Sequence, residues 1–251
     1  AISEALDDFK KDSPMNRLVQ GDVGCGKTVV AAALIYFAVK NGYQAAMMAP
    51  TEILANQHYA SLSPLLKQWG INTEILTGSQ KDSVKKEICE GTKSGNIHVL
   101  IGTHALIESR VEFKNLALVV TDEQHRFGVG QRAKLTGKGD NPHVLVMSAT
   151  PIPRTLALIM YGDLDISVID ELPPGRKPVG TFLVDNSYRE RMYKFLKKEI
   201  FAGRQVYIVC PLVEENEALE LKAVESFTKE LSEKVFADYS VGLIHGRIKA
   251  K

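Results

Sequence analysis

The chain has 251 residues, 45% of them hydrophobic and 24% charged, and a formal net charge of +1, which are ordinary values for a soluble globular protein of one or two domains. Its three cysteines lie far apart, which argues against a disulfide framework or a zinc site, and since neither a membrane span nor a signal peptide is evident, we expect a cytoplasmic protein. The near-neutral charge gives no support to nucleic-acid binding but does not exclude it, because a local groove can grip phosphates.

Short apolar runs of strand length alternate with helical segments along the first part of the chain. The expected strands are Arg17–Gln20, Gln44–Ala49, Thr73–Leu76, Val99–Ile101, Leu116–Thr121 and Val144–Ser148. The expected helices are Thr28–Lys40, Ile53–Gln68 and Ser83–Lys93. Alternation of this kind predicts an α/β fold with a parallel sheet that is covered by helices on both faces.

The pattern is interrupted at Glu171–Pro178, a segment rich in proline and glycine that is typical of a linker. Beyond this segment the alternation restarts. The expected strands are Val179–Val184, Val206–Pro211 and Val241–Ile244, and the expected helices are Tyr188–Ala202 and about Glu214–Lys234. We therefore predict a first domain at residues 1–170, the linker at 171–178, and about half of a second α/β domain at 179–251.

Residues Gly21–Thr28 satisfy the pattern G-x-x-x-x-G-K-[ST] and lie between an expected strand and an expected helix. The glycines allow backbone N–H groups to surround phosphate oxygens, and the start of the helix adds partial positive charge. Lys27 is expected to reach the β- and γ-phosphates of ATP, and the Thr28 hydroxyl to bind Mg²⁺. The residues expected to bind the nucleotide are Gly21, Asp22, Val23, Gly24, Cys25, Gly26, Lys27, Thr28 and Val29.

Two interpretations of Cys25, inside this loop, stay open. Because such a loop holds phosphate with its backbone, the side chain at this position can be a small filler. Alternatively, the start of the helix and the nearby Lys27 make the thiol reactive. In that case alkylation would block nucleotide binding, and bound nucleotide would protect the thiol.

A second motif, Leu118–His125, is an apolar strand that ends in two carboxylates, a glutamine and a histidine. An ATPase with a phosphate-binding loop needs such a pair of carboxylates. Asp122 is expected to hold Mg²⁺, and Glu123 to orient and deprotonate the attacking water. Gln124 and His125 are expected to face the γ-phosphate.

Four segments together resemble the motifs of superfamily 2 helicases. Asp122–His125 is similar to their second motif, and Met147–Pro151 to the third, which couples ATP hydrolysis to movement. Ala49–Ala55 and Gly102–His104 are similar to the two motifs that contact the nucleic-acid backbone. The resemblance implies a RecA-like fold. The positions that it implies in nucleic-acid contact or coupling are Pro50, Thr51, Gly102, Thr103, His104, Ser148, Ala149 and Thr150.

Longer strings narrow the resemblance to the RecG family, and they run along essentially the whole chain. These strings are Pro14–Gly24, Asp122–Val129, Ala149–Thr155, Tyr161–Asp165, Glu171–Pro178, Val209–Leu212 and His245–Arg247. The resemblance implies a monomeric motor that uses ATP and Mg²⁺, translocates on double-stranded DNA, and remodels stalled forks and Holliday junctions in recombination and repair. It also adds His245, Gly246 and Arg247 to the residues implied in nucleic-acid contact or coupling.

The RecG family has a further feature that is not found among these 251 residues. Its second motor domain carries an arginine-bearing motif, Q-x-x-G-R-x-G-R, and no arginine after Asp170 lies in such a setting. An arginine of this kind contributes roughly a thousandfold or more in rate. We therefore expect the chain to be a piece of a longer protein, and we expect it to bind ATP but to hydrolyse it poorly.

Two other functions stay open. The transcription-repair coupling translocases share several of these strings, although Met15–Asn16, Ala49–Glu52 and Val209–Leu212 favour the RecG family. A non-catalytic nucleotide-binding module would also fit the phosphate-binding loop.

The six histidines do not form the pattern of a metal site. His104, His125 and His245 fall in or beside the motifs described above. His58 and His98 lie outside them, and we interpret both as ordinary surface or packing residues.

Overall fold

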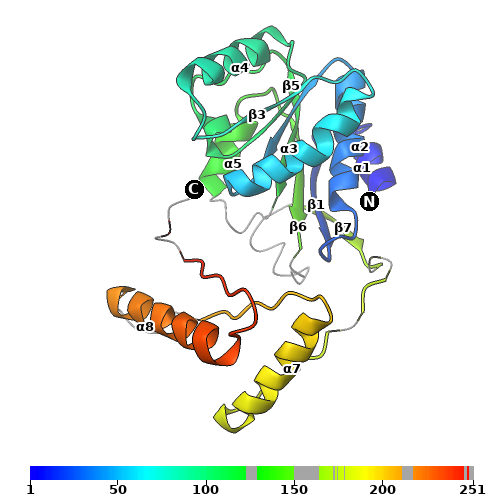
Figure 1. The fold of residues 1–251 in the computed structure, drawn as a ribbon. Helices are drawn as coiled ribbons and strands as arrows, with labels where there is room; N and C mark the ends of the chain where they lie inside the picture. Colours follow the sequence, from blue (N-terminus) through cyan, green and yellow to red (C-terminus); the bar gives the residue numbers. More distant parts are fainter. Residues whose placement is uncertain are drawn as a thin grey trace. The chain divides into compact units, whose positions relative to one another are not determined.

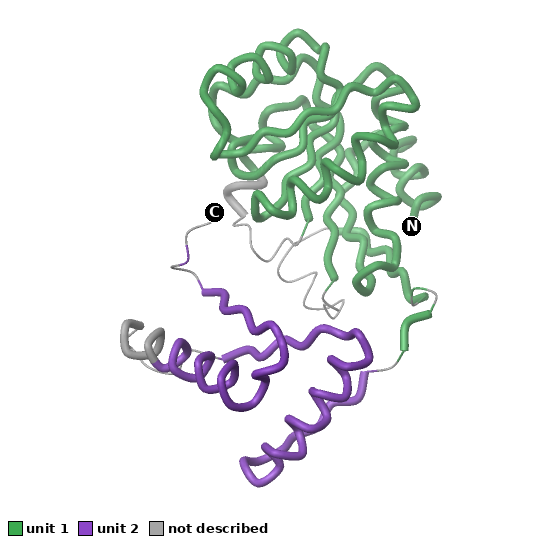
Figure 2. The backbone as a smooth tube through the Cα atoms, in the orientation of Figure 1, with its two compact units in different colours: residues 1–177 green, residues 178–251 purple. Residues whose placement is uncertain are grey.

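The structure is a computed structural model that describes residues 1–122, 129–149, 164–171, 173, 175–177, 179–210, 217–245 and 248. The chain forms two compact units, Ala1–Lys177 and Pro178–Lys251, which Figure 2 shows in different colours. Apart from His245, Gly246 and Arg247, the predicted site residues belong to the first unit.

The first unit is built on a seven-stranded sheet with the strand order β3-β4-β2-β5-β6-β1-β7 (Figure 1). Neighbouring strands pair in parallel throughout. The strands are β1 (Asn16–Gly21), β2 (Gln44–Met48), β3 (Thr73–Leu76), β4 (Val99–Gly102), β5 (Leu116–Asp122), β6 (His143–Ser148) and β7 (Asp165–Ile169). Every residue of β2 and β4 is buried, as expected for parallel strands that are covered on both faces.

Helices cover both faces of the sheet, and those after β1 connect strands, because parallel strands cannot be joined by tight turns. They are α1 (Ile2–Asp8), α2 (Lys27–Lys40), α3 (Glu52–Lys67), α4 (Asp82–Ser94) and α5 (Val129–Thr136), together with a 3-10 turn, η1 (His104–Ile107). Side chains of α1, α2 and α3 pack in one buried cluster, and side chains of α4, α5 and η1 pack in another. Each helix that the structure describes is too short or too polar to span a membrane.

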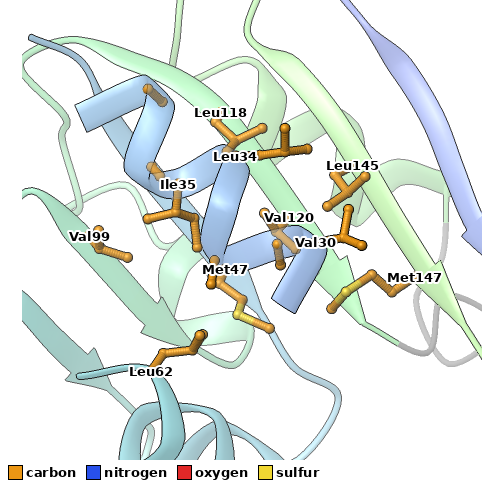
Figure 3. Packing of buried hydrophobic residues seen from close by; sticks show 14 of the residues in the cluster. Val30, Leu34, Ile35, Met47, Leu62, Val99, Leu118, Val120, Leu145 and Met147 are labelled. Atoms are coloured by element: carbon orange, nitrogen blue, oxygen red, sulfur yellow. The ribbon is translucent and has the colours of Figure 1, made fainter. Parts of the chain in front are cut away.

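Successive residues of each strand point to opposite faces of the sheet. In β5, Leu118 and Val120 pack in the cluster that contains α2 and α3, whereas Val119 packs in the cluster that contains α4 and α5. Figure 3 shows the first cluster, in which Leu34 and Ile35 of α2 lie among side chains of the strands. Burying one such side chain contributes about 1.5–3 kcal/mol, so the alternation fixes which face each strand residue presents.

A buried ion-pair network anchors α1 to two strands. The guanidinium of Arg17 in β1 donates from Nε to Asp8 Oδ2 in α1 at 2.6 Å and from Nη1 to Ser167 Oγ in β7 at 2.9 Å. Glu4 also contacts Arg17 and Ser167. Burial by itself would raise the pKa of Asp8, but hydrogen bonds from Arg17 and Lys11 outweigh burial, so this pKa lies below its ordinary value.

The six strands and three helices that the sequence predicts for this unit are confirmed, and their ends differ by at most one residue. The sequence does not predict α1, η1, α5 or β7. Both α1 and β7 are short, and both are held by the Arg17 network, whose bonds join residues 9 and 150 positions apart in the chain. Local propensity is too weak to predict such elements.

The second unit contains the two predicted helices. They are α7 (Arg189–Phe201), preceded by the 3-10 turn η3 (Asn186–Tyr188), and α8 (Glu217–Glu230), which continues into a π-helical turn, η4 (Leu231–Val235). The ring of Tyr193 in α7 packs edge-on against Phe236, with 5.8 Å between the ring centroids. This contact joins α7 to the turn that follows α8.

The strands predicted at Val179–Val184, Val206–Pro211 and Val241–Ile244 are not formed in the described residues. A strand needs hydrogen-bonded neighbours, and even an isolated pair of strands is marginally stable in water. The extended segments have no partner strand within the described part of the unit, so apolar side chains such as Leu183 and Val209 remain exposed.

Candidate functional site

The predicted site residues of the first unit follow the carboxyl ends of five neighbouring strands. In the order β4-β2-β5-β6-β1, these strands end side by side. Gln20 of β1 pairs with Ser148 of β6, and Met147 of β6 pairs with Asp122 of β5. In open parallel sheets, ligands bind at this edge. We call the part at β1, β6 and β5 the nucleotide end and the part at β2, β3 and β4 the β2–β4 end.

The phosphate-binding loop connects β1 to α2, and its shape depends on glycine. Gly24 and Gly26 have φ values of +82° and +100°, a conformation that other residues rarely adopt. A Cβ atom on Gly21 would lie 2.6 Å from Cys25 Sγ and 2.9 Å from the carbonyl oxygen of Ile169. Gly26 is the N-cap of α2, so the first N–H groups of this helix follow the loop, as an anion site requires.

The Lys27 ammonium lies against the loop itself. Its Nζ donates to the carbonyl oxygens of Gly21 at 2.7 Å and of Asp22 at 2.9 Å. These bonds place the positive charge where the sequence predicts the phosphates.

A short segment after β7 packs on the same loop, a contact that the residue pattern does not predict. Arg176 Nη1 lies 2.7 Å from Asp22 Oδ2 and donates to the carbonyl oxygen of Val23 at 3.1 Å. The backbone N–H of Val23 and the Arg176 guanidinium lower the pKa of Asp22. Pro173 also approaches Gly24. The end of the predicted linker therefore braces the phosphate-binding loop.

Asp122, at the end of β5, is hydrogen bonded to a histidine of α3. His58 Nε2 lies 2.7 Å from Asp122 Oδ2, and the side chains are only 11% and 13% exposed. From the residue pattern, His58 is interpreted as an ordinary surface or packing residue; the structure excludes the surface position, because His58 is buried and bonds Asp122. The two residues are 64 positions apart, and no local signal in the sequence connects them.

The β2–β4 end is held together by side chains. Thr51 is the N-cap of α3, and its Oγ1 accepts from the N–H of Leu54 at 3.3 Å. Glu52 reaches the loop after β3, where Oε1 accepts from the N–H of Ser79 at 3.0 Å and Oε2 from its hydroxyl at 2.7 Å. The bond from the Ser79 hydroxyl is the main cause of a lowered pKa at Glu52.

The strands β3 and β4 approach closely at Gly102. A Cβ on Gly102 would lie 2.2 Å from the carbonyl oxygen of Leu76.

The predicted contact residues differ in exposure. At the β2–β4 end, His104 is exposed, Pro50 and Thr51 are half-buried, and Gly102 and Thr103 are buried. Ala149 is half-buried and Ser148 is buried. A direct contact with nucleic acid is open to the exposed and half-buried residues, whereas buried residues can act only through their neighbours.

The remaining predicted residues lie elsewhere. His245 belongs to the second unit, where its Nε2 lies 4.0 Å from Glu225 Oε1. The predicted residues that lie outside the described part of the chain are Glu123, Gln124, His125, Thr150, Gly246 and Arg247.

The donor set fits a magnesium ion that travels with a nucleotide. Thr28 is in the first turn of α2, and Asp122 ends β5. In the described part of the chain, no three His, Cys, Asp or Glu side chains gather as in a protein-made metal cage. Mg²⁺ bound with ATP does not need such a cage, because phosphates and water supply most of its ligands.

Known proteins resemble the chain along most of its length. The DEAD/DEAH box helicase family matches residues 2–159. ATP-dependent DNA helicase RecG of Aquifex aeolicus is 57% identical over 253 residues, covering 100% of this chain and 32% of that protein. The Bacillus subtilis RecG helicase is 49% identical over 247 residues, covering 98% of this chain and 36% of that protein.

Solved structures agree with the fold. A structure of RecG bound to a three-way DNA junction has a TM-score of 0.77 and 45% identity, covering 93% of this chain and 30% of its own. The yeast protein Dbp5, at 16% identity and a TM-score of 0.58, covers 92% of this chain and 68% of its own, and it shares the fold alone. The chain spans about a third of the length of the RecG relatives. It belongs to the DEAD/DEAH box helicase family, and it resembles the RecG helicases along its whole length.

Proposed function

We propose that the chain is the nucleotide-binding core of an ATP-dependent DNA helicase motor that remodels branched DNA, such as stalled forks and Holliday junctions. The observation that carries this proposal is the common edge of the sheet. The phosphate-binding loop and Asp122 lie on the strand ends next to those that carry Pro50, Thr51 and His104. The names of the RecG relatives, and the DNA junction bound by one of them, support the substrate class.

The residues of the nucleotide end suit phosphoryl transfer to water. The loop backbone and Lys27 would bind the phosphates, while Thr28 and Asp122 would hold Mg²⁺, which would neutralise charge on the phosphate oxygens. Glu123 accepts a proton from the attacking water as its oxygen bonds to the γ-phosphorus, and the bond to the β–γ bridging oxygen breaks. The products are ADP and inorganic phosphate.

We propose further that this chain alone binds ATP but hydrolyses it slowly. Its sequence contains no arginine in the setting of the second motor domain of the family. Such an arginine stabilises the charge of the transition state and contributes roughly a thousandfold or more in rate.

The test is ATP turnover with and without branched DNA. We would compare the 251-residue chain with a chimera in which it replaces the matching residues of the Bacillus subtilis RecG helicase, to which it is 49% identical. We expect DNA-stimulated turnover from the chimera and turnover slower by roughly a thousandfold or more from the chain alone. A folded chimera that binds ATP but is not stimulated by DNA would contradict the motor and favour a non-catalytic nucleotide-binding module. Full DNA-stimulated turnover by the chain alone would contradict the proposal of slow hydrolysis.

A further inference from the structure

One helix connects the two ends of the sheet edge. The N-cap of α3 is Thr51, at the β2–β4 end, and His58 lies seven residues later, on the same side of the helix after about two turns. At 1.5 Å per residue, the two positions are separated by about 10 Å along the axis. His58 bonds Asp122 of the nucleotide end, so a single rigid element touches both ends.

The alternation along β5 explains why this contact forms. Leu118 and Val120 face the cluster that contains α2 and α3, and Asp122, two residues further, faces the same way. On α3, Leu62 and Leu66 are buried in that cluster. A polar ring on this side of the helix is costly unless it is hydrogen bonded, and the bond that it makes is to the Asp122 carboxylate.

We propose that His58 is a positioning residue for Asp122, and that through it α3 couples nucleic-acid binding near Thr51 to the metal-holding carboxylate. The Nε2–H of His58 donates to Oδ2, which fixes the orientation of the carboxylate that would hold Mg²⁺. A hydrogen bond to an ionised carboxylate is stronger than one between neutral groups. The inference rests on the proposed function, because it assigns a partner to the predicted metal ligand.

The first test is the Mg²⁺ dependence of nucleotide binding. A fluorescent ATP analogue is titrated onto the 251-residue chain at increasing Mg²⁺ concentration. In His58→Leu we expect the Mg²⁺ concentration for half-maximal binding to rise by about 10- to 100-fold, the loss typical when the partner of a metal ligand is removed. Binding of the metal-free analogue should stay unchanged, since His58 contacts the carboxylate and not the loop.

A matched control separates positioning from packing. His143 lies at the opposite, amino end of β6, and its Nδ1 accepts from the N–H of Met15 at 2.9 Å. His143→Leu also removes a hydrogen bond of a histidine ring, so it should destabilise the fold without changing the Mg²⁺ dependence. If His143→Leu and His58→Leu shift the Mg²⁺ dependence equally, the inference is wrong.

If His58→Leu does not fold, two polar variants test whether His58 positions Asp122. The amide nitrogen of glutamine reaches the position of Nε2, whereas asparagine is shorter and reaches only the position of Nδ1. We expect His58→Gln to bind with near wild-type Mg²⁺ dependence and His58→Asn to resemble the leucine variant. Equal behaviour of the two would overturn the inference.

The second test measures coupling. The affinity of the chimera for branched DNA is measured with and without a Mg²⁺-bound, non-hydrolysable ATP analogue. In the wild type, the ATP analogue should change the affinity for DNA, typically by about 5- to 150-fold for coupled sites. In His58→Leu this change in affinity should be much smaller or absent. Undiminished coupling in His58→Leu would refute the role of α3 and leave the proposed function intact, whereas a folded wild-type chain that binds no nucleotide would refute the proposed function itself.

Discussion

The two ends of the sheet edge are built by different means. The nucleotide end is shaped by backbone: Gly24 and Gly26 adopt left-handed conformations, and Lys27 bonds carbonyl oxygens of the loop. The β2–β4 end is shaped by side chains, because Thr51 caps α3 and Glu52 holds Ser79 of the next loop. A small charged ligand is best bound by a cradle of backbone N–H groups, whereas a long polymer needs loops that are held in a row.

This difference predicts that substitutions at one end leave the other end largely unaffected. Only changes to the common fold, or to the His58 contact that joins the ends, should affect both. The following variants test this separation.

The largest effect on stability is expected in the common fold, from breaking the buried ion pair between Asp8 and Arg17. Asp8→Asn removes the main charged partner of Arg17, and both side chains are less than 10% exposed. Breaking a buried pair in this way costs about 3–5 kcal/mol, so we expect a loss of this size in the free energy of unfolding, measured with denaturant at pH 7. Lys10→Ala, which breaks the exposed pair with Asp7, should cost less than about 1 kcal/mol.

The same pair predicts a pH dependence. Because the folded pKa of Asp8 lies below its ordinary value, its contribution to stability is complete above the unfolded value of about 3.9 and is lost as pH falls through the folded value. The stability difference between wild type and Asp8→Asn should therefore shrink below about pH 4. A constant difference down to pH 2 would contradict this account.

The next largest effect concerns the nucleotide end. Lys27→Ala removes charge-assisted bonds to phosphate that are worth about 1.5–3 kcal/mol, so affinity for an ATP analogue should fall roughly 10- to 100-fold. Titration calorimetry measures this loss. Lys40→Ala, at the other end of α2, is the control and should bind the ATP analogue with wild-type affinity. Both variants should bind DNA with wild-type affinity. Unchanged nucleotide affinity in Lys27→Ala would contradict the prediction that Lys27 contacts the phosphates.

An intermediate effect is expected at the β2–β4 end. In Gly102→Ala the new methyl group meets the carbonyl oxygen of Leu76, and such overpacking typically costs about 1–3 kcal/mol. We expect lower stability and weaker DNA binding with unchanged nucleotide affinity. Gly242→Ala, where a Cβ meets nothing within 4 Å, is the matched control. If nucleotide affinity falls in Gly102→Ala as much as DNA affinity, the two ends are not separable.

The smallest effect is expected at the cap of α3. Thr51→Val keeps the shape but loses the hydroxyl that accepts from Leu54, which costs about 1 kcal/mol. Thermal unfolding should show this loss, and DNA affinity should fall as well. Thr51→Ser retains the acceptor and should restore both. A serine variant as weak as the valine variant would show that the hydroxyl is not the important group.

The sequence predicted what depends on neighbouring residues. Strand runs such as Leu116–Thr121 are apolar because both faces of the sheet are covered, and the loop Gly21–Thr28 needs glycine for its own backbone. Both signals are local, so the residue pattern alone predicts the strand and the glycine-dependent backbone of the loop. The order of the strands then follows from packing, and it places Asp122 of β5 one strand, β6, away from β1, which leads into the loop.

The missed features depend on partners far away in the chain. His58 and Asp122 are 64 residues apart, and Arg176 lies 153 residues from Val23. The same reason explains the strands wrongly predicted in the second unit, since Val179–Val184 has suitable residues but no neighbour to pair with in the described residues. A residue pattern shows which secondary structure a segment can form, and the segment forms it only when a partner elsewhere in the chain packs against it.

In the proposed function, the carboxyl edge of the sheet, and not the amino edge, faces DNA beside the nucleotide. A photo-crosslinking amino acid placed at His104, exposed at the start of η1, tests it against the same group at Asn115, exposed at the amino end of β5. With branched DNA and an ATP analogue, we predict crosslinks to DNA from position 104 and few from position 115. Equal crosslinking from both positions, or crosslinking from position 115 alone, would contradict the account.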